Sequence, residues 1–289
     1  MPISDVTSFI LPLMWVFTYK GDEDGFLTRC KARLVVRGDL QRNHSQDTYA
    51  ATLAARVFRA LMAIAAYFDL DIQQFDAVNA FCNAFLDEDV YVRYPDGFHI
   101  PGHCLQLIRA LYGLPKSPLL WYNLMCEYLR KLGLSPIPDC PCLFTSNKLI
   151  VFFYVDDIAV LYHPSNRSFY DGFRTEFLKA FKMREMGELK WFLGIRVIRD
   201  RKARKIWLCQ DAYITKLCNR FRRPGSSAYR PKTPMTAPPP DPYTGDATAE
   251  QILQYSQLVG SLTYPVSITR PDIAFCTKIL AQNLKNPGP

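Results

Sequence analysis

The chain has 289 residues, of which 49% are hydrophobic and 21% are charged, so it is neither a wholly disordered chain nor a coiled coil. Lys and Arg outnumber Asp and Glu by 35 to 27, and the net charge of +8 fits a polyanionic partner such as nucleic acid, or alternatively a solvated basic surface. No stretch has the roughly 20 consecutive apolar residues of a membrane span, and no signal peptide pattern opens the chain. Together with nine irregularly placed cysteines, this predicts an intracellular protein, cytoplasmic or nuclear, with reduced thiols and no membrane partner.

The first half of the sequence predicts a mixture of strands and helices. Apolar and charged pieces alternate over 11–42 around an acidic turn at 22–25, which indicates a hairpin. Apolar residues at three- and four-residue spacing predict an amphipathic helix over 53–68. A short strand is expected over 71–76 and another over 90–94, where a Pro-Asp-Gly turn follows.

The second half continues in the same irregular order. Helices are predicted over 121–132 and 169–181, on either side of an apolar hairpin at 148–163. Residues 191–198 and 206–209 are expected to form a second hairpin around a charged turn. This interleaving of strands and helices indicates an α+β fold.

The C-terminal part has a different composition. Seven prolines between 224 and 242 indicate a linker, and two helical patterns follow at 250–263 and 272–284. The predicted organisation is therefore a folded domain over 1–222, a Pro-rich linker over 223–248 and a small helical part over 249–289.

Three acidic residues interrupt apolar strands. Asp76 ends the strand at 71–76, and Asp156 and Asp157 lie at the tip of the apolar hairpin. An ionised carboxylate at the edge of a core is costly unless a partner compensates it, and divalent cations do so well. Such a group could hold two Mg²⁺ ions about 3.5–4 Å apart. The alternative is that the Asp156-Asp157 doublet is a polar turn.

Six segments carry motifs that occur together in one known family. In chain order they are KARLVVRG at 31–38, FDAVNAF at 75–81, LYGLPKSPLLW at 111–121, FYVDD at 153–157, GELKWFLG at 187–194 and TRPDI at 269–273. Across nearly the whole chain, this set resembles the reverse transcriptase of copia-type LTR retrotransposons. The resemblance implies a right-hand polymerase, with fingers, a palm whose antiparallel sheet carries the YVDD hairpin, and a partial thumb. The implied activity is RNA-directed DNA polymerisation, and the implied partners are an RNA template, a DNA or RNA primer and deoxynucleoside triphosphates.

The resemblance also implies roles for the acidic residues and for a nucleotide site. Asp76, Asp156 and Asp157 would be the catalytic ligands of two Mg²⁺ ions, with Mn²⁺ as a possible substitute. The nucleotide-binding set would comprise Lys31, Arg33, Ala80, Phe81 and Gly113. In that set Lys31 and Arg33 lie two apart on one strand face and would meet the triphosphate. Phe81 would exclude a 2′-hydroxyl, and Gly113 would let the backbone approach the template or nucleotide. The alternatives are an edge strand with protective charges and a core phenylalanine.

A second set of residues is expected to contact nucleic acid. It comprises Tyr154, a primer-gripping turn formed by Trp191, Phe192, Leu193 and Gly194, and a basic run formed by Arg199, Arg201, Lys202, Arg204 and Lys205. The basic residues would bind phosphates without reading sequence. An ordinary hairpin core and a solvated basic face are the alternatives.

The chain also departs from the family pattern. Pro115-Lys116 stands where the family has Lys-Gln, and the sequence begins close to the first motif and stops soon after the last. We therefore expect a polymerase core cut from a longer polyprotein and truncated at both ends, with 249–289 as a remnant of the connection region. The competing hypotheses are a catalytically inactive retroelement remnant that binds nucleic acid and a metal-dependent nuclease.

Overall fold

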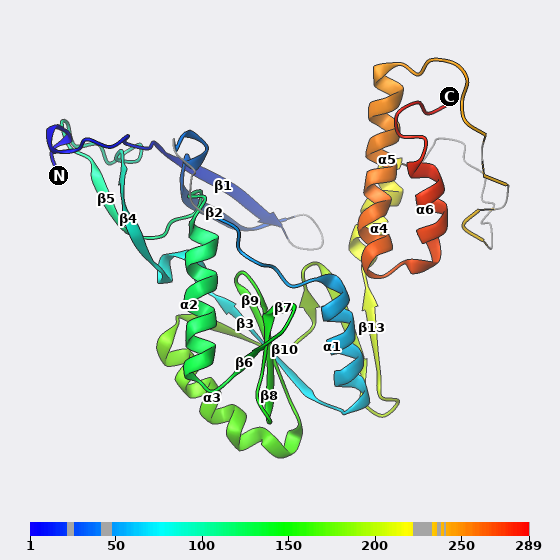
Figure 1. The fold of residues 1–289 in the computed structure, drawn as a ribbon, viewed down its shortest axis with the longest axis horizontal. Coiled ribbons are helices and arrows are strands. Elements are labelled where there is room, and N and C mark those ends of the chain that lie inside the picture. The colour runs from blue at the N-terminus through cyan, green and yellow to red at the C-terminus, as the bar shows by residue number, and fades with distance from the viewer. Residues whose placement is uncertain (22–25, 42–47, 222–232, 236–237, 240, 289) are drawn as a thin grey trace. The chain divides into compact units, whose positions relative to one another are not determined.

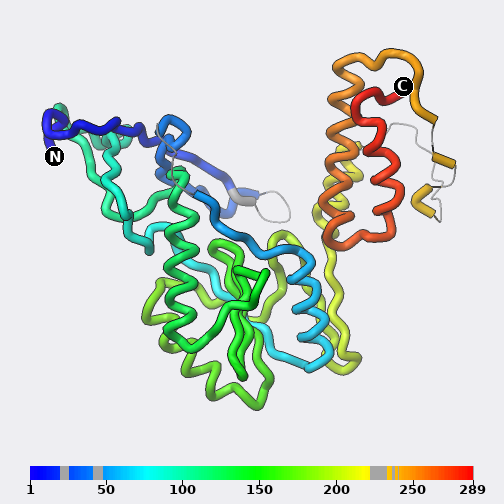
Figure 2. Tube along the Cα trace, in the orientation of Figure 1, coloured from blue at the N-terminus to red at the C-terminus, as the bar shows by residue number. Residues whose placement is uncertain are grey.

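The computed structural model describes all residues except 22–25, 42–47, 222–232, 236–237, 240 and 289. Figures 1 and 2 trace the chain from the N-terminus to the C-terminus. The chain divides into two compact units. Unit 1 comprises Met1–Leu53 and Asp71–Glu188, and unit 2 comprises Ala54–Leu70 and Leu189–Pro289. The chain therefore leaves unit 1, contributes one segment to unit 2, and returns. The predicted borders at 222 and 248 stay a prediction, because half of the predicted linker over 223–248 lies outside the described residues.

Unit 1 is built on an antiparallel sheet whose described part has six strands. In spatial order they are β10 (Met183–Glu188), β3 (Asp71–Ala77), β9 (Asp157–Tyr162), β8 (Leu149–Tyr154), β7 (Cys140–Thr145) and β6 (Ser135–Ile137). The central strands β8 and β9 are buried almost throughout. Their runs of apolar β-branched and aromatic residues explain both the strand conformation and the central position.

Two helices cover one face of this sheet (Figure 1). They are α2 (Ser117–Lys131) and α3 (Arg167–Ala180). The ring of Phe75 on β3 lies 5.8 Å from Phe177 of α3, and Phe153 on β8 lies 6.0 Å from Tyr122 of α2. Because side chains alternate along a strand, Asp76 next to Phe75 points to the opposite face.

The rest of unit 1 consists of two smaller hairpins. Strands β1 (Leu13–Gly21) and β2 (Leu27–Val36) pair with each other, and so do β4 (Phe85–Val92) and β5 (Leu105–Arg109). The two hairpins share a small apolar core made of Leu11, Val36, Val90, Val92 and Leu114. The predicted turn at 22–25 lies outside the described residues.

Unit 2 combines a small sheet with helices. The strands β11 (Trp191–Phe192), β12 (Ile195–Asp200) and β13 (Lys205–Cys209) form one antiparallel sheet, and β13 runs beside α1 (Ala55–Tyr67) in Figure 1. The other helices are α4 (Asp211–Phe221), α5 (Ala249–Ile268) and α6 (Ala274–Ala281). A capping box formed by Thr248 and Gln251 begins α5.

Most predicted elements are confirmed, with differences at their ends. The helix over 53–68 and the hairpin over 148–163 agree with the structure within a few residues. The predicted strand over 191–198 is wrong in one respect, because Leu193 and Gly194 take positive φ and break it into β11 and β12. The elements that were not predicted include strands β5, β6, β7 and β10 and helix α4. No described helix has the length and apolarity needed to cross a membrane.

Candidate active site

A cleft of about 500 Å³ in unit 1 joins strand β2 to the edge of the large sheet. Two of the three predicted carboxylates, Asp76 and Asp156, line it. On the facing strand, Lys31 and Arg33 line it as well, two residues apart as the sequence predicted. The cleft therefore places cationic side chains across from a pair of acids, which suits an anionic ligand accompanied by a cation.

The hairpin tip that carries Asp156 is strained and braced. Val155 and Asp156 form the two-residue loop between β8 and β9, and Val155 has φ +56°, a conformation that β-branched residues rarely adopt. Strain of this kind costs on the order of 1–3 kcal/mol and persists only where the surroundings impose it. Here the buried Trp121 donates its indole N–H to the Val155 carbonyl oxygen at 2.7 Å. Trp121 of the LYGLPKSPLLW segment thus fixes the loop that presents Asp156.

The third carboxylate lies beside the first in the sheet. Asp157 on β9 is directly opposite Asp76 on β3, and Arg184 on β10 is opposite Asp76 on its other side. Directly opposed residues share one face, so these three form a row across three strands. Gln74 donates a hydrogen bond from Nε2 to Asp157 Oδ1 at 3.3 Å. Asp157 is not among the residues that line the cleft.

Burial and mutual repulsion make the ionised forms of Asp156 and Asp157 unfavourable. Burial raises the pKa of Asp157 to about 6, and repulsion from Asp156 adds to the rise. Burial also raises the pKa of Asp156, against the opposing effect of Lys31 and Arg33. A raised carboxylate pKa in a cleft, as at Asp156, is a mark of functional sites.

The donor chemistry fits a hard divalent cation, but only in part. Carboxylate oxygens are the ligands that Mg²⁺ prefers, and Asp76 and Asp156 share the cleft. Within the described ranges, no group of three or more His, Cys, Asp or Glu side chains is arranged to hold a metal ion. The residues therefore fit a cation held by Asp76 and Asp156, while the full three-carboxylate set remains a prediction from the sequence.

Replacing Asp157 by Asn should stabilise the chain in the absence of added metal. A folded-state pKa near 6, above the usual value near 4, makes ionised Asp157 destabilising above pH 6 and neutral in effect below pH 4. After allowance for partial exposure, we expect a gain of about 1 kcal/mol at pH 7.5 that disappears at pH 4. Denaturant unfolding at both pH values measures it. The exposed Asp96, changed to Asn, is the control; an equal gain at both pH values would contradict the assignment.

Gly113 makes a close approach, although to the chain itself. It has φ +96°, and a Cβ there would lie 2.0 Å from the carbonyl oxygen of Val36 at the end of β2. A Cβ on Gly38 would in turn lie 2.0 Å from the Gly113 carbonyl oxygen. The two glycines let the 111–115 loop and the end of β2 meet backbone to backbone. The predicted approach of Gly113 to a template or nucleotide stays a prediction; the structure shows its close approach to Val36.

Two residues of the predicted nucleotide-binding set, Ala80 and Phe81, are not among the residues that line the cleft. Ala80 and Phe81 begin a short 3₁₀ helix, Ala80–Asn83; Ala80 is fully buried and Phe81 is half-buried. The Phe81 ring lies 4.6 Å from that of Tyr112, which does line the cleft. Burial, followed by the charge of Asp156, raises the pKa of Tyr112. Sequence reasoning missed the polar lining residues Arg29, Asn79 and Arg184.

The side chains of the predicted primer-gripping turn differ in their exposure. Trp191 is 47% exposed and Tyr154 is half-buried, so both remain available as contact residues. The prediction for Phe192 needs correction, because this side chain is 1% exposed and stacks on Phe58 of α1 at 4.9 Å. The hairpin-core alternative therefore applies to Phe192. The turn itself is held where the Tyr264 hydroxyl donates to the Leu193 carbonyl oxygen at 3.0 Å.

The basic run is also partly structural. The Arg199 side chain is only 10% exposed and pairs with Asp69 at 2.8 Å, just past the end of α1. Arg201 pairs with the same carboxylate at 3.1 Å, and Arg204 donates to the Tyr67 carbonyl oxygen at 2.9 Å. Cations at a helix C-terminus satisfy its unpaired carbonyls. The three arginines thus fasten the β12–β13 hairpin to α1. The prediction of a phosphate contact needs correction only for Arg199, whose side chain is largely buried. Arg201, Lys202, Arg204 and Lys205 are exposed, and their phosphate contacts stay a prediction.

Changing Arg199 to Gln should therefore lower stability without weakening nucleic-acid binding. Losing the buried charge-assisted bonds is expected to cost about 2 kcal/mol. Lys202→Gln, in the turn of the same β12–β13 hairpin, should change the free energy of unfolding by less than about 0.5 kcal/mol. Thermal unfolding compares the two, and a salt titration of binding to a primer–template duplex tests the contact. A salt slope reduced in Arg199→Gln at unchanged stability would restore the phosphate role.

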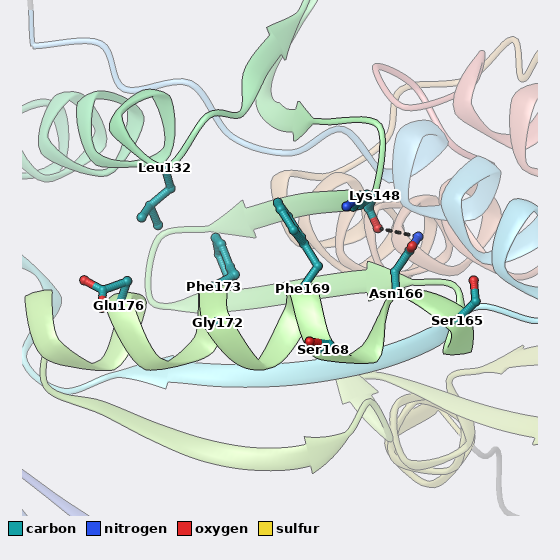
Figure 3. Close-up of a pocket in the computed structure, with 9 residues that line it drawn as sticks. All are labelled: Leu132, Lys148, Ser165, Asn166, Ser168, Phe169, Gly172, Phe173 and Glu176. Carbon is teal, nitrogen blue, oxygen red and sulfur yellow. Dashed lines mark hydrogen bonds between the residues drawn. The ribbon is translucent and has the colours of Figure 1, made fainter.

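A second pocket of similar size runs along α3 (Figure 3). Its walls come from α3, from Leu132 after α2, and from Lys148 in the turn before β8. Lys148 lies over the Phe169 ring at 4.8 Å, and its carbonyl oxygen accepts a hydrogen bond from Asn166. The pocket contains none of the residues that the sequence motifs mark, and it is separate from the acidic cleft.

Comparison with known proteins identifies the family of the chain. A profile of the family "Reverse transcriptase (RNA-dependent DNA polymerase)" matches residues 6–237. The chain is 30% identical, over 96% of its length, to the retrovirus-related Pol polyprotein from transposon TNT 1-94 of Nicotiana tabacum, and covers 22% of that protein. It is 32% identical, over 99% of its length, to the Pol polyprotein from transposon RE1 of Arabidopsis thaliana, and covers 20% of it.

A shorter relative is the putative transposon Ty5-1 protein of Saccharomyces cerevisiae, which is 28% identical over 73% of this chain and 70% of its own length. The chain spans about a fifth of the plant polyproteins, and the profile match lies within that span. The chain belongs to the reverse transcriptase (RNA-dependent DNA polymerase) family and is similar to the corresponding segment of copia-type retrotransposon Pol polyproteins.

Proposed function

We propose that the chain is an RNA-directed DNA polymerase, which adds deoxynucleotides to a primer paired with an RNA template. The observation that carries the proposal is the acidic cleft. Asp76 and Asp156 lie across from Lys31 and Arg33, in a chain that belongs to the reverse transcriptase family. Phosphoryl transfer depends mainly on positioning and electrostatic stabilisation, which this combination of charges can supply.

The acidic and the basic residues of the cleft have different roles. Asp76 and Asp156 would hold divalent cations, Mg²⁺ or Mn²⁺, which supply charge neutralisation and activation of the primer hydroxyl when bound. Lys31 and Arg33 bind the triphosphate, Arg33 through its planar fork and Lys31 as a point charge. Trp121 keeps the strained loop, and with it the Asp156 carboxylate, in a fixed position before substrate arrives. Asp157 acts beside them as the third acid of the proposed two-metal site.

The remaining elements fit a right-hand polymerase. We assign the six-stranded sheet to the palm, the β1–β2 and β4–β5 hairpins to the fingers, and the β11–β13 sheet with the following helices to a partial thumb and connection remnant. Phe81, held against Tyr112, would exclude a ribose 2′-hydroxyl from the cleft. The exposed or half-buried candidates for primer–template contact are Tyr154, Trp191, Leu193, Gly194, Arg201, Lys202, Arg204 and Lys205.

Primer extension tests the proposal directly. The purified chain is mixed with a DNA primer on an RNA template, all four deoxynucleoside triphosphates and Mg²⁺, or Mn²⁺ in a second series. We expect template-directed products that disappear on chelation. Salt-sensitive binding to the duplex without incorporation in either metal would instead identify an inactive remnant, and degradation of the template or primer would identify a nuclease.

A further inference from the structure

Arg184 is a cation of the cleft that no sequence motif marked. It lies on β10, an edge strand of the large sheet, directly opposite Asp76. It lines the same cleft as Lys31 and Arg33, which come from the other wall. Its position follows from the pairing of β10 with β3, which gives Arg184 and Asp76 the same face of the sheet.

The pairing of Arg184 with Asp76 is loose. Arg184 Nη1 lies 3.8 Å from Asp76 Oδ2, beyond the usual 2.7–3.2 Å of an N–H···O hydrogen bond. The Arg184 side chain is 55% exposed and that of Asp76 is 32% exposed. An exposed pair at this distance contributes little to stability, so fold maintenance does not explain it. The guanidinium keeps its donors available for a stronger acceptor.

The cleft offers such an acceptor a site with cations on two sides. Arg29, Lys31 and Arg33 stand on β2, and Arg184 stands on the sheet edge beside Asp76, with Asp156 also in the lining. A ligand that carries several anionic oxygens can meet both walls at once. Phosphate oxygens match the planar fork of a guanidinium, which forms shorter and stronger bonds with them than with neutral acceptors.

We propose that Arg184 contacts the phosphates of the nucleotide that enters the cleft, leaving its loose pairing with Asp76 to do so. This inference rests on the proposed function and extends it, because it assigns a phosphate contact to the sheet wall in addition to those from β2. The exchange also releases the Asp76 carboxylate as the nucleotide enters. The ligand class is a nucleoside triphosphate, recognised at this residue through its phosphate chain.

Calorimetric titration tests the inference without requiring turnover. The probes are dTTP in buffer with Mg²⁺, and inorganic tripolyphosphate, which has neither base nor sugar. Loss of one charge-assisted contact in Arg184→Gln is expected to weaken binding of both probes about tenfold. Arg184→Lys, which keeps the charge and loses the fork, should fall between. Arg174→Gln is the matched control, because Arg174 pairs with the next residue of β10, Glu185, at 2.7 Å and does not line the cleft.

Each outcome decides the question. Equal affinity in Arg184→Gln and the unsubstituted chain would overturn the inference, as would an equal loss in Arg174→Gln, or no binding of either probe by the unsubstituted chain. Binding that follows the expected order, in a chain that fails to extend a primer, would support the inference and reject the polymerase. If the chain is active, we expect Arg184→Gln to raise the KM for nucleotide at constant kcat. A fall in kcat alone in this variant would show that Arg184 acts only through Asp76.

Discussion

Changing Asp76 or Asp156 to Asn is expected to lower primer extension by about 10³-fold or more, since removing a single preorganised electrostatic group from an active site commonly costs 10²–10³-fold. Both side chains line the cleft, and each loses the charge that a divalent cation requires while keeping nearly the same shape. Single-nucleotide incorporation under saturating primer–template measures the effect. The affinity for the primer–template duplex should change by less than about twofold, because Asp76 and Asp156 lie in the cleft and not in the basic run at 199–205.

The control for this prediction is Asp96→Asn, at an exposed carboxylate outside the cleft lining. It should retain incorporation within about twofold, as expected of a surface substitution. If Asp156→Asn incorporated nucleotide at the rate of Asp96→Asn, the acidic cleft could not be the catalytic site. A weaker effect of Asp157→Asn than of the other two would agree with the position of Asp157 outside the lining.

Gly113→Ala should strongly destabilise unit 1. The new Cβ would lie 2.0 Å from the Val36 carbonyl oxygen and 2.7 Å from Val35 Cγ1, in a backbone with φ +96°. Val36 also donates its backbone N–H to the Tyr112 carbonyl oxygen at 2.8 Å, so neither side can retreat without losing that bond. Overpacking, strain and a lost hydrogen bond together are expected to cost about 3–5 kcal/mol.

Gly133→Ala separates the clash from the backbone conformation. Gly133 has φ +81° after α2, but nothing lies within 4 Å of a Cβ placed there. Its substitution should cost only the conformational term, about 1 kcal/mol. Chemical denaturation of both variants gives the comparison. Equal losses would mean that the meeting of the 111–115 loop with β2 is not as tight as described.

Much of the site could be read from the sequence because its signals are local. Carboxylates that interrupt apolar strands stand out in one dimension, and the YVDD hairpin follows from two apolar arms around Asp156 and Asp157. Lys31 and Arg33 share a face because strand periodicity is two. The structure adds the opposition of Asp76 and Asp157, which depends on strand register and has no local signature.

The residues that sequence reasoning missed or misassigned are those whose partners are distant in the chain. Strand β10 reads Met-Arg-Glu-Met-Gly-Glu, without apolar alternation, and forms through backbone pairing with β3, so Arg184 gave no signal. Arg199 looked like a phosphate ligand because its partner, Asp69, lies 130 residues earlier. Phe192 belonged to a recognised motif, yet its environment is set by Phe58.

The discontinuous order of the two units has a consequence for dissecting the protein. The chain passes between them at three junctions, after Leu53, Leu70 and Glu188. Two fragments divided at Glu188 would therefore leave α1 on the N-terminal fragment, although it belongs to unit 2. Phe58 would then be on a different fragment from Phe192, and Asp69 on a different fragment from Arg199. Separate production of the two halves thus calls for a circularly permuted or two-piece design that returns residues 54–70 to the β11–β13 sheet.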